Sequence, residues 1–297
     1  PILWVGKRMG WLGRRIDSTA KWLLKFRIIR APARLLANSR FAWSFVSRTD
    51  RIRANRLRDR VIGGQIPQHV SIIMDGNRRF AENEGLESSI GHRYGKQKLE
   101  EVMDWVLELN IPYLTVYALS TENVINRTDD ELEVLFDLYV EGLEDLLKNE
   151  RIFSNQVKVQ VAGHKELLPR NVIDAIENAE KATIDHSGCV FTICLAYGSR
   201  EEILAAVRSI AVDHASGDVS LEEIDEVMIS RRLYTGGLPD PDLIIRTSGE
   251  ERISNFLLWQ AAYSELYFTD VFWPSFSKSD FLSAIESYQN RKRRFGE

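Results

Sequence analysis

The sequence predicts an α/β protein with a largely parallel β-sheet that is covered by helices on both faces. After residue 66, short and almost entirely apolar runs alternate with longer segments of helical periodicity. Clusters of polar residues directly follow several of the apolar runs, as ligand-binding residues do at the carboxyl ends of parallel strands. The hydrophobic content of 44% is sufficient for a sizeable core.

The individual strands and helices follow from the same patterning. Five apolar runs are predicted to be strands, at residues 69–74, 113–118, 157–162, 190–196 and 243–245. Helical spacing is found between them, at residues 93–109, 129–149, 170–184 and 200–215. Thr128 and the three acidic residues after it form a favourable helix start. Strands that alternate with helices indicate parallel pairing.

The charge of the chain is divided unevenly. Residues 1–66 carry 16 Lys and Arg but only 3 Asp and Glu, whereas residues 67–297 carry 23 and 40. Because two parts of such opposite charge meet different surroundings, we predict a basic N-terminal extension at 1–66 and a globular domain at 67–297.

The extension is predicted to contain an amphipathic helix at residues 7–26. Leu12, Ile16 and Leu23 lie on one side of such a helix, and Trp11 and Trp22 lie at the border of its basic side. This pattern is typical of a helix in an anionic membrane surface. A helix docked on its own domain, or an unstructured tail, fits the same residues. Nucleic acid fits less well, because the aromatic residues alternate with Leu and Ile, and none is expected as a partner.

Two further observations indicate the compartment. Cys189 and Cys194 lie five residues apart in an apolar run, which favours strand packing in a reducing environment over a disulfide or a metal site. No apolar run reaches the roughly 18 residues that a membrane-spanning helix needs, and no cleavable signal sequence is expected. We therefore expect a cytoplasmic protein that is peripherally associated with the membrane.

Polar clusters follow the first, second and fifth predicted strands. Asp75 supplies a hard oxygen ligand for a Mg²⁺ ion that also meets substrate phosphates. Gly76 permits close approach of the backbone, whose N–H groups at the next helix start could bind phosphate. Forked donors that match phosphate oxygens are available from Arg79, Arg127, Arg246 and Arg252. Each residue alone could be a helix cap or a surface residue, but together they predict a diphosphate site.

The sequence does not match the motifs of other classes of phosphate-binding protein. No Gly-rich run ends in Gly-Lys-Ser or Gly-Lys-Thr, so a P-loop is absent from the sequence. A phosphatase with an aspartyl nucleophile would want a second acid where Asn77 stands. The stretch Asp129–Glu133 has a superficial likeness to the Asp-rich signature of trans-prenyltransferases, but it lacks the final Asp and suits a helix N-terminus.

Five segments together resemble the cis-prenyltransferases, which include undecaprenyl diphosphate synthases and dehydrodolichyl diphosphate synthases. They are MDGNRRFA (74–81), GH (91–92), YALSTEN (117–123), LIIRTSGEERISNFLLWQAAYSELYFTD (243–270) and RKRRFG (291–296). The resemblance covers residues 67–297, and its longest segment is highly specific. The long basic extension outside it suggests an archaeal version of the family.

The resemblance implies a six-stranded parallel sheet flanked by helices, and a homodimer. It also implies a Mg²⁺-dependent transferase that condenses isopentenyl diphosphate repeatedly onto farnesyl or geranylgeranyl diphosphate. Each step makes a new Z double bond, and the long polyprenyl diphosphate serves as precursor of a glycosyl carrier lipid. The alternative is a non-catalytic regulatory subunit of such an enzyme; those subunits lose the loop aspartate, whereas this chain keeps Asp75.

Particular residues take roles from the resemblance. Asp75 matches the essential acid that positions magnesium on the diphosphate, and it is expected to be catalytic together with Asn123. His92 matches a histidine near the transferred diphosphate. The loop that holds the allylic diphosphate matches Gly76, Asn77, Arg78, Arg79 and Phe80, with Phe80 at the usual tryptophan position.

The second substrate has its own matching positions. Ser120, Thr121, Glu122 and Asn123 match the segment that orients isopentenyl diphosphate and removes its proton. Arg127 matches the arginine that follows this segment, after a one-residue insertion, and is expected to bind substrate. The diphosphate of isopentenyl diphosphate is expected at Arg246, Arg252 and Ser254, with Ile253 beside them as a further substrate-binding residue. Glu265 matches a second acidic group associated with the metal, and Arg294 and Gly296 match a C-terminal element that reaches across the dimer to the partner's site.

The chain departs from the common family pattern at two positions. The family has glycine where this chain has Arg78, and arginine where this chain has Ser88. We predict that Arg78 replaces the missing cation at the allylic diphosphate; the alternative is that Arg78 points to solvent. An apolar tunnel for the growing chain is expected beside the helix at 129–149, where two or three of the following would line it: Leu132, Leu135, Phe136, Tyr139 and Leu143.

Overall fold

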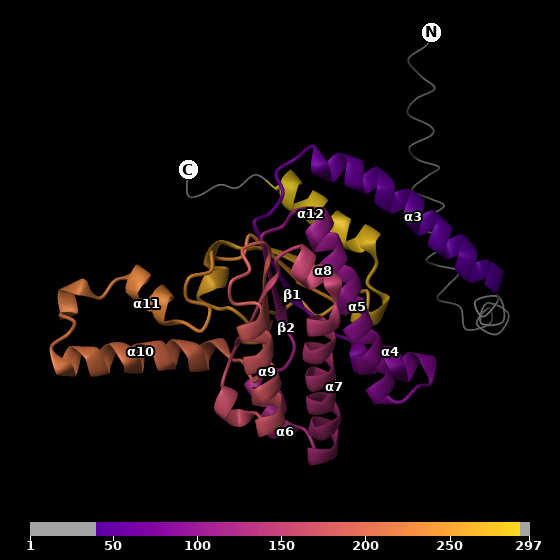
Figure 1. The fold of residues 1–297 in the computed structure, drawn as a ribbon. Coiled ribbons are helices and arrows are strands. Elements are labelled where there is room, and N and C mark those ends of the chain that lie inside the picture. Colours follow the sequence, from indigo (N-terminus) through magenta and orange to yellow (C-terminus); the bar gives the residue numbers. More distant parts are fainter. Residues whose placement is uncertain (1–39, 292–297) are drawn as a thin grey trace, which may run out of the picture. The chain divides into compact units, whose positions relative to one another are not determined.

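A computed structural model describes residues 40–291 of the chain, with side chains described at residue 50 and from residue 52 onward (Figure 1). The chain forms two compact units, Pro1–Asn55 and Arg56–Glu297. The second unit contains the sheet and every element discussed below. The amphipathic helix expected at 7–26, and Arg294 and Gly296 of the C-terminal element, lie outside the described residues.

Helix α3 (Arg40–Ile62) starts in the first unit and ends in the second. Within the second unit its last turns are part of the core, because Leu57 and Val61 are buried. Arg58 Nε also pairs with Glu108 at 2.6 Å. Packing of the second unit therefore starts before residue 67.

The sheet has six strands, all parallel, in the order β3-β4-β2-β1-β5-β6. Its strands are β1 (His69–Ile73), β2 (Tyr113–Tyr117), β3 (Lys158–Ala162), β4 (Val190–Cys194), β5 (Leu243–Arg246) and β6 (Glu265–Phe268). This confirms the predicted α/β class. The apolar runs correspond to β1 to β5. Strand β6 was expected only from the family resemblance, because it is a four-residue edge strand whose residues are all half-buried.

Helices lie on both faces of the sheet (Figure 1). They are α4 (Asn77–Glu84), α5 (Ser88–Glu108), α6 (Thr121–Asn126), α7 (Asp129–Lys148), α8 (Glu150–Ser154), α9 (Arg170–Ala182), α10 (Ser199–Ser216), α11 (Glu226–Arg232) and α12 (Lys278–Asn290). Helix α7 packs between α5 and α9, whereas α12 contacts β5 and β6. Helices α10 and α11 pack on each other and project from the sheet (Figure 1). The Thr128 hydroxyl caps α7, as predicted.

The strand register determines where the site lies. Ile73, the last residue of β1, pairs with Tyr117 at the end of β2 and with Arg246 at the end of β5. The loops that follow these three central strands therefore leave the sheet at the same level. Parallel strands all end at one edge, so the three predicted polar clusters meet there.

His69 makes the stability of this sheet sensitive to pH. It is 2% exposed, its Nδ1 donates to the Pro239 carbonyl at 2.7 Å, and its Nε2 lies 2.8 Å from the Thr115 hydroxyl. Burial lowers the pKa of His69 from 6.5 to about 4, which outweighs the Pro239 bond and the charge of Asp242. The folded protein therefore keeps this ring neutral at pH values where the unfolded chain is already protonated.

A group with a depressed folded-state pKa of this kind stabilises the fold above its unfolded pKa, and loses that contribution as pH falls. We expect the free energy of unfolding to drop by about 2 kcal/mol between pH 7 and pH 5 on account of His69. Urea unfolding at both pH values measures the drop. His69→Gln should remove this part of the pH dependence, and His214→Gln, at an exposed histidine, should retain it. An unchanged slope in His69→Gln would contradict the assignment.

Candidate active site

Asp75, in the loop after β1, is held between two arginines. Its Oδ2 accepts from Arg246 Nη2 at 2.9 Å, and its Oδ1 accepts from Arg79 Nη2 at 3.1 Å. The Thr247 hydroxyl donates to the Asp75 carbonyl at 2.6 Å and lies 3.0 Å from its N–H. Burial alone would raise the pKa of Asp75, but the bond and charge of Arg246, and then those of Arg79, lower it below the ordinary value. The carboxylate is therefore ionised at neutral pH.

Gly76 gives the same loop its tight path. Its φ is 105°, a left-handed conformation that favours glycine. A Cβ at this position would come within 2.8 Å of the Phe272 ring and 2.9 Å of the Ser248 Cβ. The next residue starts α4, so the first N–H groups of that helix have no partner within the helix.

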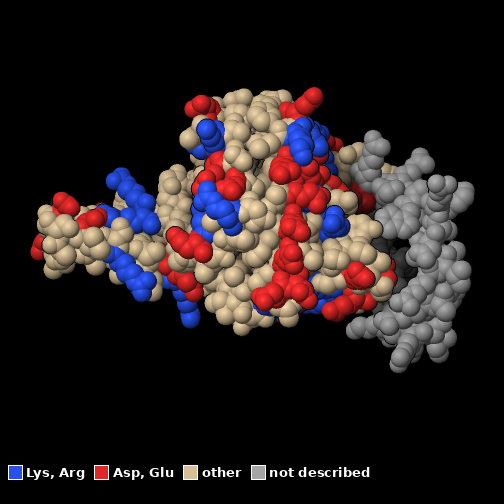
Figure 2. Space-filling model, turned by 60° about the horizontal axis from the view of Figure 1, so that its bottom comes forward, with Lys and Arg blue, Asp and Glu red and all other residues tan. Residues whose placement is uncertain are grey.

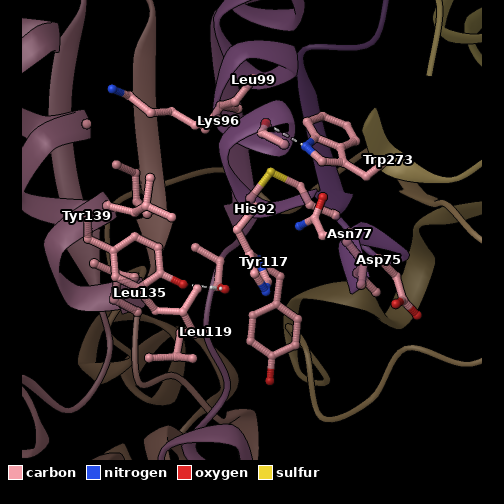
Figure 3. A pocket seen from close by; sticks show the side chains of 18 of the residues that line it. Asp75, Asn77, His92, Lys96, Leu99, Tyr117, Leu119, Leu135, Tyr139 and Trp273 are labelled. Atoms are coloured by element: carbon pink, nitrogen blue, oxygen red, sulfur yellow. Dashed lines mark hydrogen bonds between the residues drawn. The ribbon is translucent and has the colours of Figure 1, made fainter. Parts of the chain in front are cut away.

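Helix α5 packs against the start of α4 through two glycines. A Cβ on Gly91 would overlap the Asn77 carbonyl oxygen, and one on Gly95 would come within 2.5 Å of Asn77 Oδ1. The Gly95 carbonyl accepts a bond of 2.8 Å from the indole of buried Trp273 (Figure 3). The positions of Asn77 and of α5 are thus fixed relative to each other.

The cluster after β2 is tied to a distant loop. The Ser120 hydroxyl caps α6 by accepting from Asn123 N–H at 3.1 Å, while Thr121 is buried. Asn255 Nδ2 donates to Glu122 Oε1 and to Glu201 Oε2, each at 3.1 Å. Burial would raise the pKa of Glu122, but its hydrogen bonds, including the one from Asn255, lower it. Glu122 is therefore a carboxylate at the mouth of the site.

The loop after β5 folds back over Arg246, which is 4% exposed. Arg246 Nη1 donates to the Ser254 hydroxyl at 2.8 Å and to the Arg252 carbonyl. Ser254 and Asn255 have positive φ values of 47° and 61°, conformations that cost energy and cluster at functional sites. Phe256 fixes this strained loop, because it is fully buried and stacks on Tyr117 at 4.6 Å.

Two arginines and a histidine form a second polar group at the same cavity. Burial, followed by the charges of Arg127 and Arg78, lowers the pKa of His92 to about 4. The Nε of Arg127 is buried and has no hydrogen-bond partner among the described residues. Arg78 pairs only loosely with Glu131, at 3.7 Å. Arg78 and Arg127 are therefore two cations beside a neutral His92, and Glu131 is the carboxylate that pairs with Arg78, an arrangement that favours an incoming anion.

These polar groups surround the mouth of one cavity of about 1220 Å³. Part of its wall is hydrophobic and includes Leu99, Leu119, Leu135 and Tyr139, while Lys96 and Asp145 also line it (Figure 3). The Tyr139 hydroxyl donates to the Ala118 carbonyl at 2.9 Å, which ties α7 to the end of β2. Of the five α7 residues considered for a tunnel, three line the cavity, namely Leu135, Tyr139 and Leu143, and α7 adds Leu138 and Leu146.

The remaining predicted site residues lie at or beyond the edge of this group. Ile253 packs against the core below the site. Phe80 makes an edge contact with Tyr94, and Ser88, the first residue of α5, is exposed. Glu265 lies at the start of β6, opposite Leu243, and pairs with Arg291 at 2.5 Å. Because β1, β5 and β6 are parallel, Glu265 lies at the amino ends of these strands, whereas Asp75 follows the carboxyl end of β1. The metal role of Glu265 stays a prediction.

The residues around Asp75 fit a magnesium ion that takes only one or two of its ligands from the protein. Asp75 supplies one carboxylate, and Mg²⁺ characteristically takes one or two carboxylates together with waters and substrate phosphates. Within the part of the chain that the structure describes, no three His, Cys, Asp or Glu side chains form a metal-binding group. The donor set therefore suits an ion that arrives with a diphosphate rather than one in an all-protein cage.

Several residues that shape the site were missed by sequence reasoning. Glu250 pairs with Arg79 at 3.0 Å and with Arg252 at 2.5 Å. Glu202, fully buried, accepts bonds from Gln260 at 2.9 Å, from the Tyr234 N–H at 3.1 Å and from the Tyr197 hydroxyl, and burial raises its pKa. No local pattern marks these residues, because most of their partners lie far away in the sequence.

Comparisons with known proteins agree with this geometry. Residues 73–296 match the family model described as "Putative undecaprenyl diphosphate synthase". A tritrans,polycis-undecaprenyl-diphosphate synthase (geranylgeranyl-diphosphate specific) from Methanopyrus kandleri is 53% identical over 240 residues, which are 81% of this chain and 88% of that protein. The enzyme of the same name from Thermoplasma volcanium is 52% identical over 77% of this chain and 89% of its own length.

A solved structure shows the same fold. The crystal structure of lavandulyl diphosphate synthase from Lavandula x intermedia, in complex with dimethylallyl diphosphate, superimposes with a TM-score of 0.75. Its sequence is 38% identical, and the match covers 78% of this chain and 99% of that one.

Proposed function

The chain belongs to the undecaprenyl diphosphate synthase family and is a cis-type prenyltransferase, and we propose that it extends geranylgeranyl diphosphate with isopentenyl diphosphate in a Mg²⁺-dependent reaction. The observation that supports this best is the cavity itself. Asp75 and several arginines line one part of it, and a series of leucines lines another. A diphosphate with a long hydrocarbon tail matches both parts.

Each group at the mouth has a chemical task in this reaction. The allylic C–O bond breaks, a new C–C bond forms to isopentenyl diphosphate, and a proton leaves the joined unit. Mg²⁺, when bound at Asp75, would neutralise part of the charge on the departing diphosphate. Arg79, Arg78 and Arg127 would hold that diphosphate through their charges, and His92 would face it as a neutral ring. Preorganised positive charge of this kind stabilises a leaving group without reorganisation.

The second substrate fits the loop after β5. Buried Arg246, exposed Arg252 and Ser254 all line the cavity, and Arg246 donates to the Ser254 hydroxyl. We assign them to the diphosphate of isopentenyl diphosphate. Glu122 and Asn123 at the start of α6 would then orient its carbon chain and face the proton that leaves.

The primer assignment follows the relatives, whose names specify geranylgeranyl diphosphate. The test is incubation of the full chain with Mg²⁺, labelled isopentenyl diphosphate and either geranylgeranyl or farnesyl diphosphate, followed by sizing of the products. We expect long Z-polyprenyl diphosphates with the geranylgeranyl primer in preference. No incorporation with either primer would refute the proposed function, and a preference for farnesyl diphosphate would refute the primer.

Arg78 is expected to bind the primer diphosphate in place of the arginine that Ser88 replaces. Because one charge-assisted bond between arginine and phosphate contributes about 1.5–3 kcal/mol, Arg78→Gly should raise the primer KM by about tenfold or more. The KM for isopentenyl diphosphate should change little, and adding Ser88→Arg should restore much of the loss. Steady-state kinetics of both variants measure this. An unchanged primer KM in Arg78→Gly would mean that Arg78 points to solvent and does not bind the primer.

We propose a homodimer, as the family resemblance implies. Support comes from β6, which lies at one edge of the sheet and pairs on one side with β5, and from exposed apolar residues on the projecting pair α10 and α11, namely Leu204, Val207, Val212 and Val227. A second copy that covers these residues would remove apolar surface from water. Sedimentation equilibrium should give twice the chain mass of 34.1 kDa, and a monomer at micromolar concentration would count against it.

Peripheral membrane contact is assigned to the basic N-terminal residues. In the described part of the chain, every helix is too short or too polar to cross a lipid bilayer. On the face of the folded domain shown in Figure 2, basic side chains lie in separate groups beside a band of acidic ones. Residues 1–39, by contrast, carry 9 Lys and Arg and 1 Asp.

Removal of residues 1–39 should weaken binding to vesicles that contain anionic lipid, because each cation near such a surface contributes about 1 kcal/mol. The truncation keeps α3, whose last turns are buried. Vesicle co-sedimentation should show at least a tenfold loss of affinity, and added salt should reduce the difference by screening. Vesicles of neutral lipid are the control. Equal binding by the truncated chain would favour a role for these residues within the protein.

A further inference from the structure

Four charged residues that line the cavity form an alternating series with Glu250, in the order Arg252, Glu250, Arg79, Asp75 and Arg246. The successive distances are 2.5 Å, 3.0 Å, 3.1 Å and 2.9 Å. The series closes on itself, because Arg246 also donates to the backbone carbonyl of Arg252. We call this set the charge ring. It joins the loop after β1, where the primer is assigned, to the loop after β5, where isopentenyl diphosphate is assigned.

Glu250 holds its two arginines unequally. Arg79 has other partners, since it also bonds to Asp75 and to the carbonyl and hydroxyl oxygens of Ser248, and lies over the Phe272 ring. Arg252 is 62% exposed, and among the described residues Glu250 is the one side chain that pairs with it. The loss of Glu250 would therefore release Arg252 and leave Arg79 largely in place.

Glu250 is charged at neutral pH. The hydrogen bond and charge of Arg252, and then those of Arg79, lower the pKa of Glu250 below its ordinary value. An exposed arginine has many rotamers, and it loses that freedom when it binds a phosphate. If a carboxylate already restricts the side chain, less freedom is lost on binding and the affinity is higher.

We propose that Glu250 is a positioning residue that holds the Arg252 guanidinium ready for isopentenyl diphosphate and links it to Arg79 on the primer side. The proposal rests on the proposed function, because it takes the two arginines as the diphosphate contacts of different substrates. It predicts a selective effect. Loss of Glu250 weakens the binding of isopentenyl diphosphate, whereas the binding of the primer changes little.

The test compares Glu250→Ala, Glu250→Gln and Glu250→Asp with the unaltered full chain. Isothermal titration calorimetry in Mg²⁺ first measures an unreactive thiolo analogue of geranylgeranyl diphosphate, and then isopentenyl diphosphate in the presence of that analogue. In Glu250→Ala we expect the Kd of isopentenyl diphosphate to rise about tenfold, and that of the analogue to change by less than about threefold. Glu250→Gln should resemble it, because the amide has no charge and its NH₂ group replaces one of the two oxygens that accept from the arginines.

Two further variants separate positioning from a general effect on the loop. Glu250→Asp keeps the charge and should recover part of the affinity. Glu251→Ala removes an exposed neighbour and should leave both Kd values unchanged. If the unaltered chain binds neither ligand, the proposed function fails and this inference with it. If it binds both, and Glu250→Ala either keeps the isopentenyl affinity or weakens both ligands equally, the positioning role alone is wrong.

Discussion

Asp75→Ala is expected to lower kcat by about a thousandfold, which corresponds to about 4 kcal/mol of activation free energy. The carboxylate bonds to both Arg79 and Arg246, and in the proposed reaction it would also hold the metal beside the leaving diphosphate. Without it, the ion loses the one ligand that the loop supplies, so the negative charge that develops on the diphosphate is less well stabilised. Single-turnover incorporation of labelled isopentenyl diphosphate measures the loss.

The control for this variant is Asp185→Ala, because Asp185 is exposed and lies outside the site. Asp75→Asn is a second test, since the amide keeps the size of the side chain and one acceptor for the arginines, yet cannot serve as an anionic ligand. Thermal unfolding of both variants checks that they remain folded. Retention of more than about a tenth of the activity in either, about 1.4 kcal/mol of barrier, would show that Asp75 does not position the metal.

Arg246→Met is expected to affect both stability and activity. Arg246 is almost completely buried, and its removal leaves Asp75 with only the more exposed Arg79 as partner. Loss of one partner of a fully buried pair costs about 3–5 kcal/mol, but Asp75 is partly exposed, so we expect about 2–3 kcal/mol of the free energy of unfolding. The strained loop loses its bonds to the same guanidinium, so binding of isopentenyl diphosphate should be lost as well.

Urea unfolding of single and double variants distinguishes the pair from its surroundings. Asp75→Asn combined with Arg246→Met should cost less than the sum of the two single changes, because the second change removes the charge that the first left unpaired. Arg208→Met, at an exposed arginine of α10, should stay within about 0.5 kcal/mol of the unaltered protein. Strict additivity of the two site variants would contradict the pairing of Asp75 with Arg246.

The sheet and the region of the site could be predicted from local patterns. Short apolar runs such as Val70–Ile73, which alternate with helices, are typical of buried parallel strands. Parallel strands have their carboxyl ends on the same side of the sheet. Asp75 and Arg246 therefore had to be near each other once β1 and β5 were neighbours. Short elements were harder. Helix α6 has six residues, too few for a helical period to show, and its start is set by the Ser120 cap.

The pairing of side chains inside the site could not be predicted. Whether Glu250 meets Arg79 depends on the path of the loop after β5, which includes three residues with positive φ between Ser254 and Leu257. Such conformations are chosen by the packing of Phe256, not by local preference. For Glu265, the family resemblance suggested a role that the strand positions do not support directly. Its likeness to a metal-associated acid was visible in the sequence, but the strand register that separates it from Asp75 was not.

Two glycines of α5 matter for the site because they have no side chain. Gly91 and Gly95 donate no proton and bind no ion, yet the backbone and amide of Asn77 occupy the space where a methyl group would stand. What these two positions supply is vacant volume, and no chemical substitution can imitate it. A search for reactive groups alone would therefore overlook them. In a library of substitutions, we expect Gly91 and Gly95 to tolerate few replacements. They lie about one helix turn apart on α5, against Asn77.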